Sequence, residues 1–270
     1  MTALPGTPDL IQLESFAVEL AHAAADATLP IFRSGCRAED KAPGQAFDPV
    51  TEADRGAERA IRSRIAARFP DHGVLGEEYG ADRDDAEWVW VLDPIDGTRA
   101  FIAGLPLWTT LIALRWRGAP VLGLIAQPVL GEIFIGGPHR AHLHDRHGQR
   151  QLAVRSCEGL GAAIASTTDP GLFKGAQAEA WAQLQAAVRL VRYGCDAYAY
   201  AMVAAGRMDL VVETGLKPWD YEALAPVIRG AGGQISNWRG EELDGSGQVV
   251  AAGDARVLDA AIPLLRRSAI

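Results

Sequence analysis

The sequence predicts a mixed fold, with an α+β half over residues 1–150 and an α/β half over residues 151–270. Two observations lead to this prediction. The first half has two helical patterns followed by short apolar segments that turn residues separate. The second half alternates strand-like and helical segments, an order typical of α/β proteins. A chain of 270 residues can bury a sizeable core in one large domain or two smaller ones.

Two amphipathic helices are predicted at the start of the chain. Residues 9–34 carry apolar side chains at helical spacing, and the pattern ends near a proline and a glycine at 30–35. A second helix follows Thr51, whose hydroxyl can cap it, with Asp54 three residues later as in a capping box, and it runs to about residue 69. The apolar positions of the first helix are Leu13, Phe16, Val18, Leu20, Ala24 and Leu29.

Strands are predicted for the remainder of the first half. A short strand at 74–75 ends in Glu77 and Glu78, and a buried strand at 88–92 leads into a turn and a short helix after Thr98. The next three apolar segments are separated by hairpin turns, which predicts an antiparallel meander. They lie at 111–114, 121–125 and 133–135, and a last, polar hairpin is expected at 139–150.

The second half is predicted to alternate strands and helices. The expected strands are 163–166, 190–192, 210–213 and 249–251, and the expected helices are 177–188, 197–205, 221–230 and 255–266.

Composition and charge exclude several classes of protein. A net charge of −8 argues against a nucleic-acid partner or an anionic membrane, since both need a basic face. Three widely spaced cysteines without a CxxC motif argue against a disulfide framework or a zinc-thiolate site and favour a reducing, cytoplasmic setting. Residues 1–9 do not resemble a signal peptide, and the apolar stretch 121–137 is interrupted by polar residues, so no membrane span is expected.

The turn at residues 93–98 is the main candidate for chemistry. It places Asp93 and Asp96 directly after an apolar strand, followed by Gly97 and Thr98 at the start of a helix. Carboxylate oxygens suit a divalent metal ion, and backbone N–H groups at a helix start suit a phosphate group. The sequence therefore predicts a site where a metal ion and a phosphate bind together.

Two further acidic clusters are expected near this turn. Glu77 and Glu78 follow the preceding strand, and Asp220 begins a helix of the second half. Carboxylates at strand ends and helix starts gather at one edge of a sheet, where they need a compensating cation. Oxygen ligands without a thiolate select Mg²⁺, with Mn²⁺ as a substitute. Taken singly, the Glu pair is also compatible with a solvated surface, Asp220 with a helix cap, and the histidines of 139–147 with a solvated hairpin.

Four motifs in this order resemble the inositol monophosphatase family, over roughly residues 10–265. The family's fold is a layered αβαβα sandwich of the sugar-phosphatase type. Its members are Mg²⁺-dependent phosphomonoesterases and commonly homodimers, so the resemblance implies two to three Mg²⁺ ions per site and a homodimer. The motifs are Asp48-Pro49-Val50-Thr51-Glu52-Ala53-Asp54, Gly76-Glu77-Glu78, Asp93-Pro94-Ile95-Asp96-Gly97-Thr98 and Trp219-Asp220.

The resemblance also implies a role for each motif residue. The first metal ion is held by Glu77, Asp93 and the Ile95 carbonyl, the second by Asp93, Asp96 and Asp220, and a third by Glu77 with waters. Asp54 hydrogen-bonds Thr98, and this pair, with Glu77, forms the catalytic set that deprotonates the attacking water. Glu78 supports the metal ligands from behind, and the N–H groups of Gly97 and Thr98 hold phosphate oxygens.

Segments of the second half look like the histidinol-phosphatase branch of this family. They include 165–173, 193–200, 209–213 and 216–220. The resemblance implies hydrolysis of L-histidinol phosphate in histidine biosynthesis. Carboxylates at Asp196 and Glu213 suit the cationic amine and imidazole of that substrate, and Arg192 is assigned to the same substrate-binding group. Asp196 can also cap the helix that follows it.

Two departures from the family pattern stand out. Ala100 follows Arg99 where many members carry a different small residue, and the loop that carries Lys41 has no fixed register relative to Asp54, so Lys41 is given no catalytic role.

Two alternatives stay open beside this reading. The same chemistry fits inositol monophosphate, a sugar bisphosphate or a 3′-phosphoadenylate, and a non-enzymatic binding homologue is the other. An aspartyl-phosphate phosphatase is rejected because its Asp-x-Asp-x-Thr turn is one residue shorter than the stretch from Asp93 to Thr98.

Overall fold

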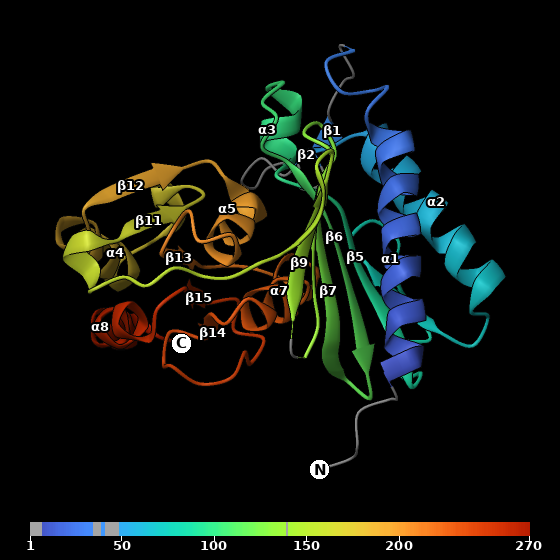
Figure 1. Cartoon of the computed structure of the whole chain (residues 1–270). Helices are drawn as coiled ribbons and strands as arrows, with labels where there is room; N and C mark the ends of the chain where they lie inside the picture. Colours follow the sequence, from blue (N-terminus) through green and yellow to red (C-terminus); the bar gives the residue numbers. More distant parts are fainter. Residues whose placement is uncertain (1–6, 35–38, 41–48, 139) are drawn as a thin grey trace.

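The chain folds into five alternating layers of helices and sheets, αβαβα, in the computed structural model (Figure 1). The structure describes residues 7–34, 39–40, 49–138 and 140–270. Lys41, most of the loop at 36–47 and His139 lie outside the described residues. The sandwich fold and its mixture of helices and sheets were both expected from the sequence.

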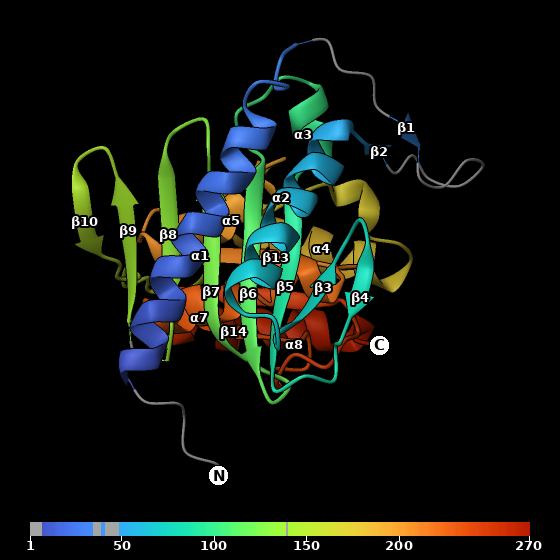
Figure 2. The same ribbon diagram turned by 90° about the vertical axis from the view of Figure 1, so that its right-hand side faces the viewer.

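The outer layer on one side consists of α1 (Thr7–Thr28) and α2 (Glu52–Arg68), which cross one face of the larger sheet (Figure 2). Their apolar faces pack on that sheet through a core cluster that includes Leu20, Ile61 and Trp90. The capping box predicted at the start of α2 is confirmed: the Ala53 N–H donates to Thr51 Oγ1 at 3.1 Å, and the Thr51 N–H donates to Asp54 Oδ2 at 2.8 Å.

The larger sheet has eight strands in the order β10-β9-β8-β7-β6-β5-β3-β4. β3 runs parallel to β5 and the other neighbours are antiparallel, so the predicted meander is confirmed. The predicted strand at 88–92 continues through the acidic turn to Asp96. The strands are β3 (Gly73–Gly76), β4 (Gly80–Asp82), β5 (Trp88–Asp96), β6 (Thr109–Trp116), β7 (Ala119–Gln127), β8 (Glu132–Gly136), β9 (Ala141–Asp145) and β10 (Gly148–Gln151).

Short elements flank the end of β5. The helix α3 (Thr98–Ile102) follows it directly, as predicted, and the two-residue strands β1 (Glu39–Asp40) and β2 (Pro49–Val50) pair with each other. Three short 3₁₀ turns lie in the second half, at Leu160–Ala162, Pro170–Leu172 and Arg266–Ser268.

The middle layer contains α5 (Asp196–Ala204), α6 (Pro218–Tyr221) and α7 (Leu224–Gly230), which lie between the two sheets. α5 and α7 are apolar nearly all round because both of their sides are covered. The helix predicted at 221–230 is divided in two, and its first turn begins at Pro218. Gly123 of β7 lets this layer approach closely, since a Cβ there would collide with the Ala223 carbonyl.

The smaller sheet has five strands in the order β12-β11-β13-β15-β14, and α4 (Ala176–Ala187) and α8 (Ala255–Leu265) cover its outer face. β11 is parallel to β12 and β13, whereas β15 is antiparallel to β13 and β14. The sequence reading missed β14 because it is only three residues long. The strands are β11 (Ile164–Thr167), β12 (Leu190–Tyr193), β13 (Leu210–Glu213), β14 (Gln234–Ser236) and β15 (Val249–Ala252).

The two sheets divide the chain between Gln151 and Ile164, close to the predicted boundary at 150. The core between them draws residues from both halves, including Val91, Phe134 and Tyr200. A division into two separate domains therefore stays a prediction. Within the described ranges, no helix has both the length and the apolar character needed to cross a membrane.

Candidate active site

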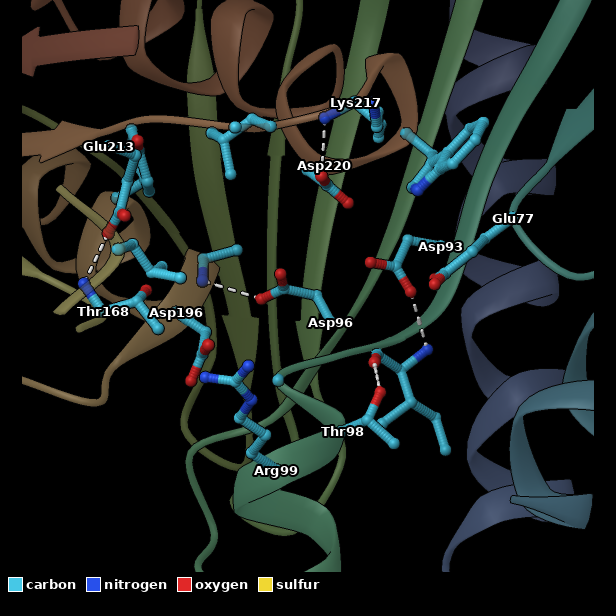
Figure 3. Close-up of a pocket in the computed structure, with 18 residues that line it drawn as sticks. Glu77, Asp93, Asp96, Thr98, Arg99, Thr168, Asp196, Glu213, Lys217 and Asp220 are labelled. Atoms are coloured by element: carbon cyan, nitrogen blue, oxygen red, sulfur yellow. Dashed lines mark hydrogen bonds between the residues drawn. The ribbon is translucent and has the colours of Figure 1, made fainter. Parts of the chain in front are cut away.

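A cavity of about 400 Å³ opens at the carboxyl end of β5, where the two halves of the chain meet. Figure 3 shows Glu77 and Asp93 on one side, Asp196 and Glu213 on the other, and Asp96 between them. The first half contributes Glu77 from the turn after β3 and residues from β5 and α3, and the second half contributes residues that include those from β13, α5 and α6. The lining residues are Glu77, Asp93, Ile95, Asp96, Gly97, Thr98, Arg99, Thr168, Leu172, Asp196, Ala197, Tyr200, Glu213, Gly215, Leu216, Lys217, Trp219 and Asp220.

The turn after β5 is held by hydrogen bonds to its backbone. The Ile95 N–H donates to Asp93 Oδ1 at 3.0 Å, and the Thr110 hydroxyl donates to the Pro94 carbonyl at 2.8 Å. The β5–β6 ladder changes register between Asp93 and Asp96, which turns both carboxylates toward the cavity. Gly97 has φ +83°, and a Cβ at this position would lie 3.0 Å from the Asp196 carboxyl carbon, so only glycine fits comfortably.

The turn that carries Glu77 is positioned by Glu58, a fully buried side chain of α2. The Glu78 N–H donates to Glu58 Oε2 at 2.8 Å, and the Tyr79 N–H donates to Oε1 at 3.2 Å. Arg62 also donates to Glu58 Oε1, at 2.7 Å. The backbone next to Glu77 is therefore fixed by a charged side chain from another layer.

Asp96 joins the two halves of the site. Its Oδ2 accepts from the Thr109 hydroxyl at 3.2 Å and from the Ala197 N–H, at the first turn of α5, at 2.7 Å. The carboxylate of one half thus satisfies a backbone donor at the start of a helix in the other. Asp196 caps no backbone N–H of α5, so the alternative role as a helix cap is wrong, and its φ of +43° directs it to the cavity.

Asp220 enters the cavity from the short helix α6. Its Oδ2 accepts from the Lys217 N–H at 2.7 Å, which fixes the first turn of the helix. Lys217 and Arg99 are the two basic residues in the lining, facing six acidic ones. The cavity therefore carries an excess of negative charge.

Burial and this excess of negative charge together raise the pKa of Asp93 and Asp96. Burial raises the pKa of Asp93, and the negative charges of Glu77, Asp96 and Asp220 raise it further. Burial also raises the pKa of Asp96, with the charge of Asp196 adding to it and the Ala197 N–H opposing it. A divalent cation would relieve this repulsion, so the donor set fits a hard metal ion.

The carboxylates are not yet gathered around one point. No group of three or more His, Cys, Asp or Glu side chains is already arranged to hold a metal ion, as far as the described residues go.

Thr98 lines the cavity on its first-half side, whereas Asp54, its predicted partner, is outside the lining. The Thr98 hydroxyl lies 3.0 Å from the Ile95 carbonyl and 3.5 Å from Asp54 Oδ1, so the carbonyl is the nearer acceptor. Asp54 is 1% exposed. Burial raises its pKa, the hydrogen bonds from Thr51 oppose the rise, and the charge of Glu77 adds to it. The predicted contact between Asp54 and Thr98 is therefore present but long.

Two of the three predicted substrate residues face the cavity. Burial raises the pKa of Glu213 to about 8, although the Thr168 N–H donates to its Oε1 at 2.6 Å. Burial raises the pKa of Asp196 to about 6, against the positive charge of Arg99. Arg192 is outside the lining, exposed on the edge strand β12, and Glu78 is also outside it, one residue beyond Glu77.

The cavity also contains residues that sequence reasoning did not select. Arg99 and Lys217 are close in sequence to motifs of the site, so their positions could have identified them as cavity residues. Thr168 acts through its backbone, which no residue pattern reveals. Tyr200 belongs to an apolar helix and could be told from a core residue only once the fold was known.

A family model described as the Inositol monophosphatase family matches residues 9–269, and the chain belongs to that family. Its αβαβα sandwich and acidic pocket are therefore those of a hydrolase that acts on small phosphate esters. The protein is accordingly a phosphatase, from a family that is generally metal-dependent.

Individual relatives carry two different substrate names. The chain is 42% identical over 266 residues to "Bifunctional phosphatase IMPL2, chloroplastic" of Arabidopsis thaliana, covering 94% of this chain and 76% of that protein. It is 37% identical to a histidinol-phosphatase of Chlorobaculum parvum, covering 91% and 92%. Among solved structures, an inositol monophosphatase from Zymomonas mobilis superimposes with a TM-score of 0.84 and 38% identity, over 94% of this chain and 98% of that one.

Proposed function

We infer that this protein is a Mg²⁺-dependent histidinol-phosphate phosphatase, which converts L-histidinol phosphate and water to L-histidinol and phosphate. The observation that carries this inference is the second set of carboxylates in the cavity. Asp196 and Glu213 lie on the side away from Glu77 and Asp93, where they match the cationic groups of the substrate. The histidinol-phosphatase relative from Chlorobaculum parvum supports the same substrate.

The proposed metal ligands are Glu77, Asp93, the Ile95 carbonyl, Asp96 and Asp220. The raised pKa values of Asp93 and Asp96 support this assignment, because each reflects burial together with the negative charge of neighbouring carboxylates, which a bound cation would offset. When bound, two to three Mg²⁺ ions, or Mn²⁺ in their place, supply stabilisation of the phosphoryl oxygens and acidify the attacking water. Glu78 supports this set from the turn behind Glu77.

The first-half residues would move the proton of the attacking water. Thr98 accepts this proton while its own passes to Asp54, whose raised pKa suits a base. The water oxygen then forms a bond to phosphorus in line with the bond to the ester oxygen, which breaks. The leaving alkoxide takes a proton from solvent water, and Asp54 returns its proton to solvent. The Gly97 and Thr98 N–H groups hold phosphate oxygens, and Glu77 completes the catalytic set.

The second-half residues would select the organic group of the ester. An ammonium group has three donors and no acceptor, so it needs acceptors on more than one side. Asp196 and Glu213 supply them from two different elements, α5 and β13. Binding a cation also stabilises the charged form of Glu213, so it should displace the proton that this group holds near neutral pH. Arg192 stays a prediction, because its exposed position gives it no contact with this cavity.

A second candidate is inositol-1-monophosphatase, favoured by the structural relative from Zymomonas mobilis. A neutral polyol also hydrogen-bonds to carboxylates, but it does not require the negative charge of two of them in one cavity. The two functions share every proposed metal ligand, so only the Asp196 side of the cavity distinguishes them.

The deciding experiment is a phosphate-release assay with Mg²⁺ on histidinol phosphate and inositol 1-phosphate. We expect kcat/KM to favour histidinol phosphate, and Asp196→Asn to lower it by about ten- to a hundredfold for that ester alone. Asparagine suits this variant because it tolerates the left-handed backbone of residue 196. Equal turnover of both esters by the wild-type protein would reject the substrate assignment.

A place in histidine biosynthesis, a cytoplasmic location and a homodimer are parts of the same proposal. Gel filtration with light scattering tests the dimer.

A further inference from the structure

Tyr200 has a buried hydroxyl group without a hydrogen-bond partner. Its side chain is 2% exposed, and its ring belongs to the core cluster between the two sheets. Among the buried side-chain polar atoms that lack a hydrogen-bond partner in the part of the chain that the structure describes, only the Tyr200 hydroxyl belongs to a residue lining the cavity. Buried tyrosine hydroxyls normally find a partner, so this one needs an explanation.

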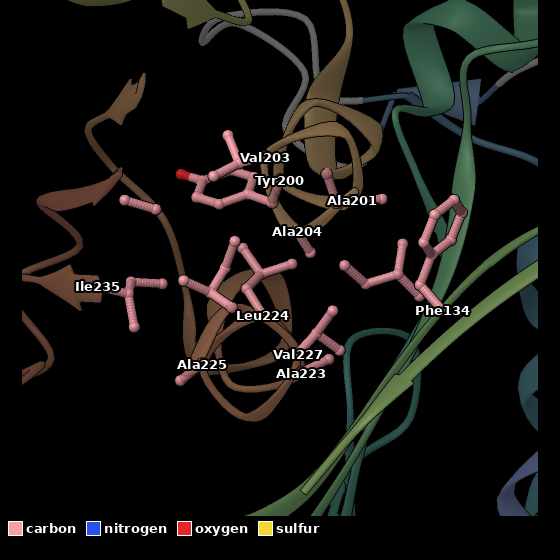
Figure 4. Packing of buried hydrophobic residues seen from close by; sticks show 14 of the residues in the cluster. Phe134, Tyr200, Ala201, Val203, Ala204, Ala223, Leu224, Ala225, Val227 and Ile235 are labelled. Atoms are coloured by element: carbon pink, nitrogen blue, oxygen red, sulfur yellow. The ribbon is translucent and has the colours of Figure 1, made fainter. Parts of the chain in front are cut away.

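The surroundings of this hydroxyl are acidic. Burial raises the pKa of Tyr200, and the charges of Glu213, Asp96 and Asp220 raise it further, so the phenol stays protonated. The phenolic oxygen points away from Phe134 and the large sheet (Figure 4). Tyr200 lines the cavity together with Asp96, Glu213 and Asp220, and the negative charges of these three residues act on its hydroxyl. An anion would be repelled there, whereas a cationic donor would be attracted.

We propose that Tyr200 is a specificity-determining residue, whose phenolic oxygen accepts a hydrogen bond from the ammonium group of the phosphate ester beside Glu213. This inference rests on the proposed function. It gives the ammonium group three acceptors, one each from Tyr200, Glu213 and Asp196. The Tyr200 hydroxyl thus has a hydrogen-bond partner only when the substrate is bound.

The neighbouring Tyr198 provides a matched control on the same helix. Its hydroxyl donates to Glu132 Oε2 at 2.7 Å, and Tyr198 does not line the cavity. Replacing it with phenylalanine removes a hydrogen bond that the ligand-free protein makes, so Tyr198→Phe should lower the melting temperature. Tyr200→Phe removes a hydroxyl that is unpaired in the ligand-free protein, so it should leave the melting temperature unchanged or raise it.

The test compares both variants on histidinol phosphate, on its analogue with the amine replaced by hydrogen, and on inositol 1-phosphate. For Tyr200→Phe we expect KM for histidinol phosphate to rise about tenfold or more, with kcat little changed and both amine-free esters unaffected. Calorimetry with histidinol should show the same loss of affinity. Tyr198→Phe should leave all three KM values unchanged.

Three results would overturn the proposal, and they are distinguishable. A lowered melting temperature with an unchanged KM would make the Tyr200 hydroxyl structural. An equal fall in kcat for all three esters, with a higher Mg²⁺ requirement, would place its action at the metal ions. A wild-type preference for an amine-free ester would reject the proposed function, and with it the ammonium contact.

Discussion

Asp209 and Asp93 are equally buried aspartates, at 1% and 2% exposure, yet their pKa values move in opposite directions. Burial raises the pKa in both cases. At Asp209 the hydrogen bonds from Arg155, at 2.8 and 2.5 Å, and from the Ile164 N–H, at 2.7 Å, outweigh burial and lower it. At Asp93 the nearest charges are other carboxylates, which add to the effect of burial.

The difference separates acids that serve the fold from acids that serve the site. Glu222 and Glu58 resemble Asp209, because Arg115 and Arg62 pair with them inside the protein. Asp93, Asp96 and Glu213 are buried with too little positive charge around them. A protein keeps such a cluster only at a cost in stability, so its partner is expected to come from outside the chain.

The largest expected effect comes from removing the charge of Asp93, one of the acids of the cavity. Asp93→Asn should lower kcat by about a thousandfold or more, since a metal ligand supplies several kcal/mol of transition-state stabilisation. The melting temperature of the metal-free protein should not fall, because the change relieves repulsion. Phosphate release and thermal unfolding measure the two quantities. Substantial turnover by this variant would contradict the metal assignment.

The matching experiment removes Asp209, one of the acids that stabilise the fold. Asp209→Ala should lower the free energy of unfolding by about 2 kcal/mol, a value reduced from that of a fully buried pair because Arg155 is partly exposed. Urea unfolding measures this change. The folded variant should keep the kcat/KM of the wild type, and loss of activity without loss of stability would break the distinction between the two groups.

A smaller effect is expected for Glu58, an acid that stabilises the fold and also positions the turn that carries Glu77. Glu58→Gln retains one acceptor for the turn after β3 and offers an NH₂ group where the second acceptor was. We expect about tenfold weaker apparent Mg²⁺ affinity, with kcat at saturating Mg²⁺ largely preserved. A magnesium titration of activity tests this, and an unchanged titration midpoint would show that Glu77 does not depend on Glu58.

The last expected effect is a pH dependence of stability. The pKa of Glu213 is raised from 4.5 to about 8, so between these values the folded protein holds a proton that the unfolded chain has lost. Stability from this group is therefore lost as pH rises from 4.5 to 8, by at most about 1.4 kcal/mol per pH unit. The melting temperature, measured in EDTA between pH 5 and 8, should fall less steeply with pH for Glu213→Gln than for the wild-type protein. Parallel curves for both proteins would argue against the raised pKa.

Local patterns predicted most of the fold and the first-half side of the site. The capping box at Thr51, the strand before Asp93 and the helix after Thr98 each depend on neighbouring residues, so the sequence carries them directly. The division of the helix near residue 221 was missed because apolar periodicity continues across the break between α6 and α7.

The remaining features depend on contacts between distant residues. The Asp96 carboxylate satisfies the Ala197 N–H, 101 positions away, and no pattern within either segment predicts that bond. Tyr200 lies in a helix where nearly every residue is apolar and buried, so its sequence context indicates core. Arg192 was assigned to the substrate from the sequence alone, whereas its exposed strand position keeps it out of the cavity.

The bond from the Ala197 N–H to Asp96 has a consequence for any attempt to divide the protein. Cutting the chain at residues 152–163 would leave Glu77, Asp93 and Asp96 on one fragment and Asp196, Glu213 and Asp220 on the other. Neither fragment would contain a complete set of ligands, and the second would lose the acceptor at the first turn of α5. Hydrolysis would return only with reassociation, so the two fragments form a natural pair for split-protein complementation, with released phosphate as the reporter.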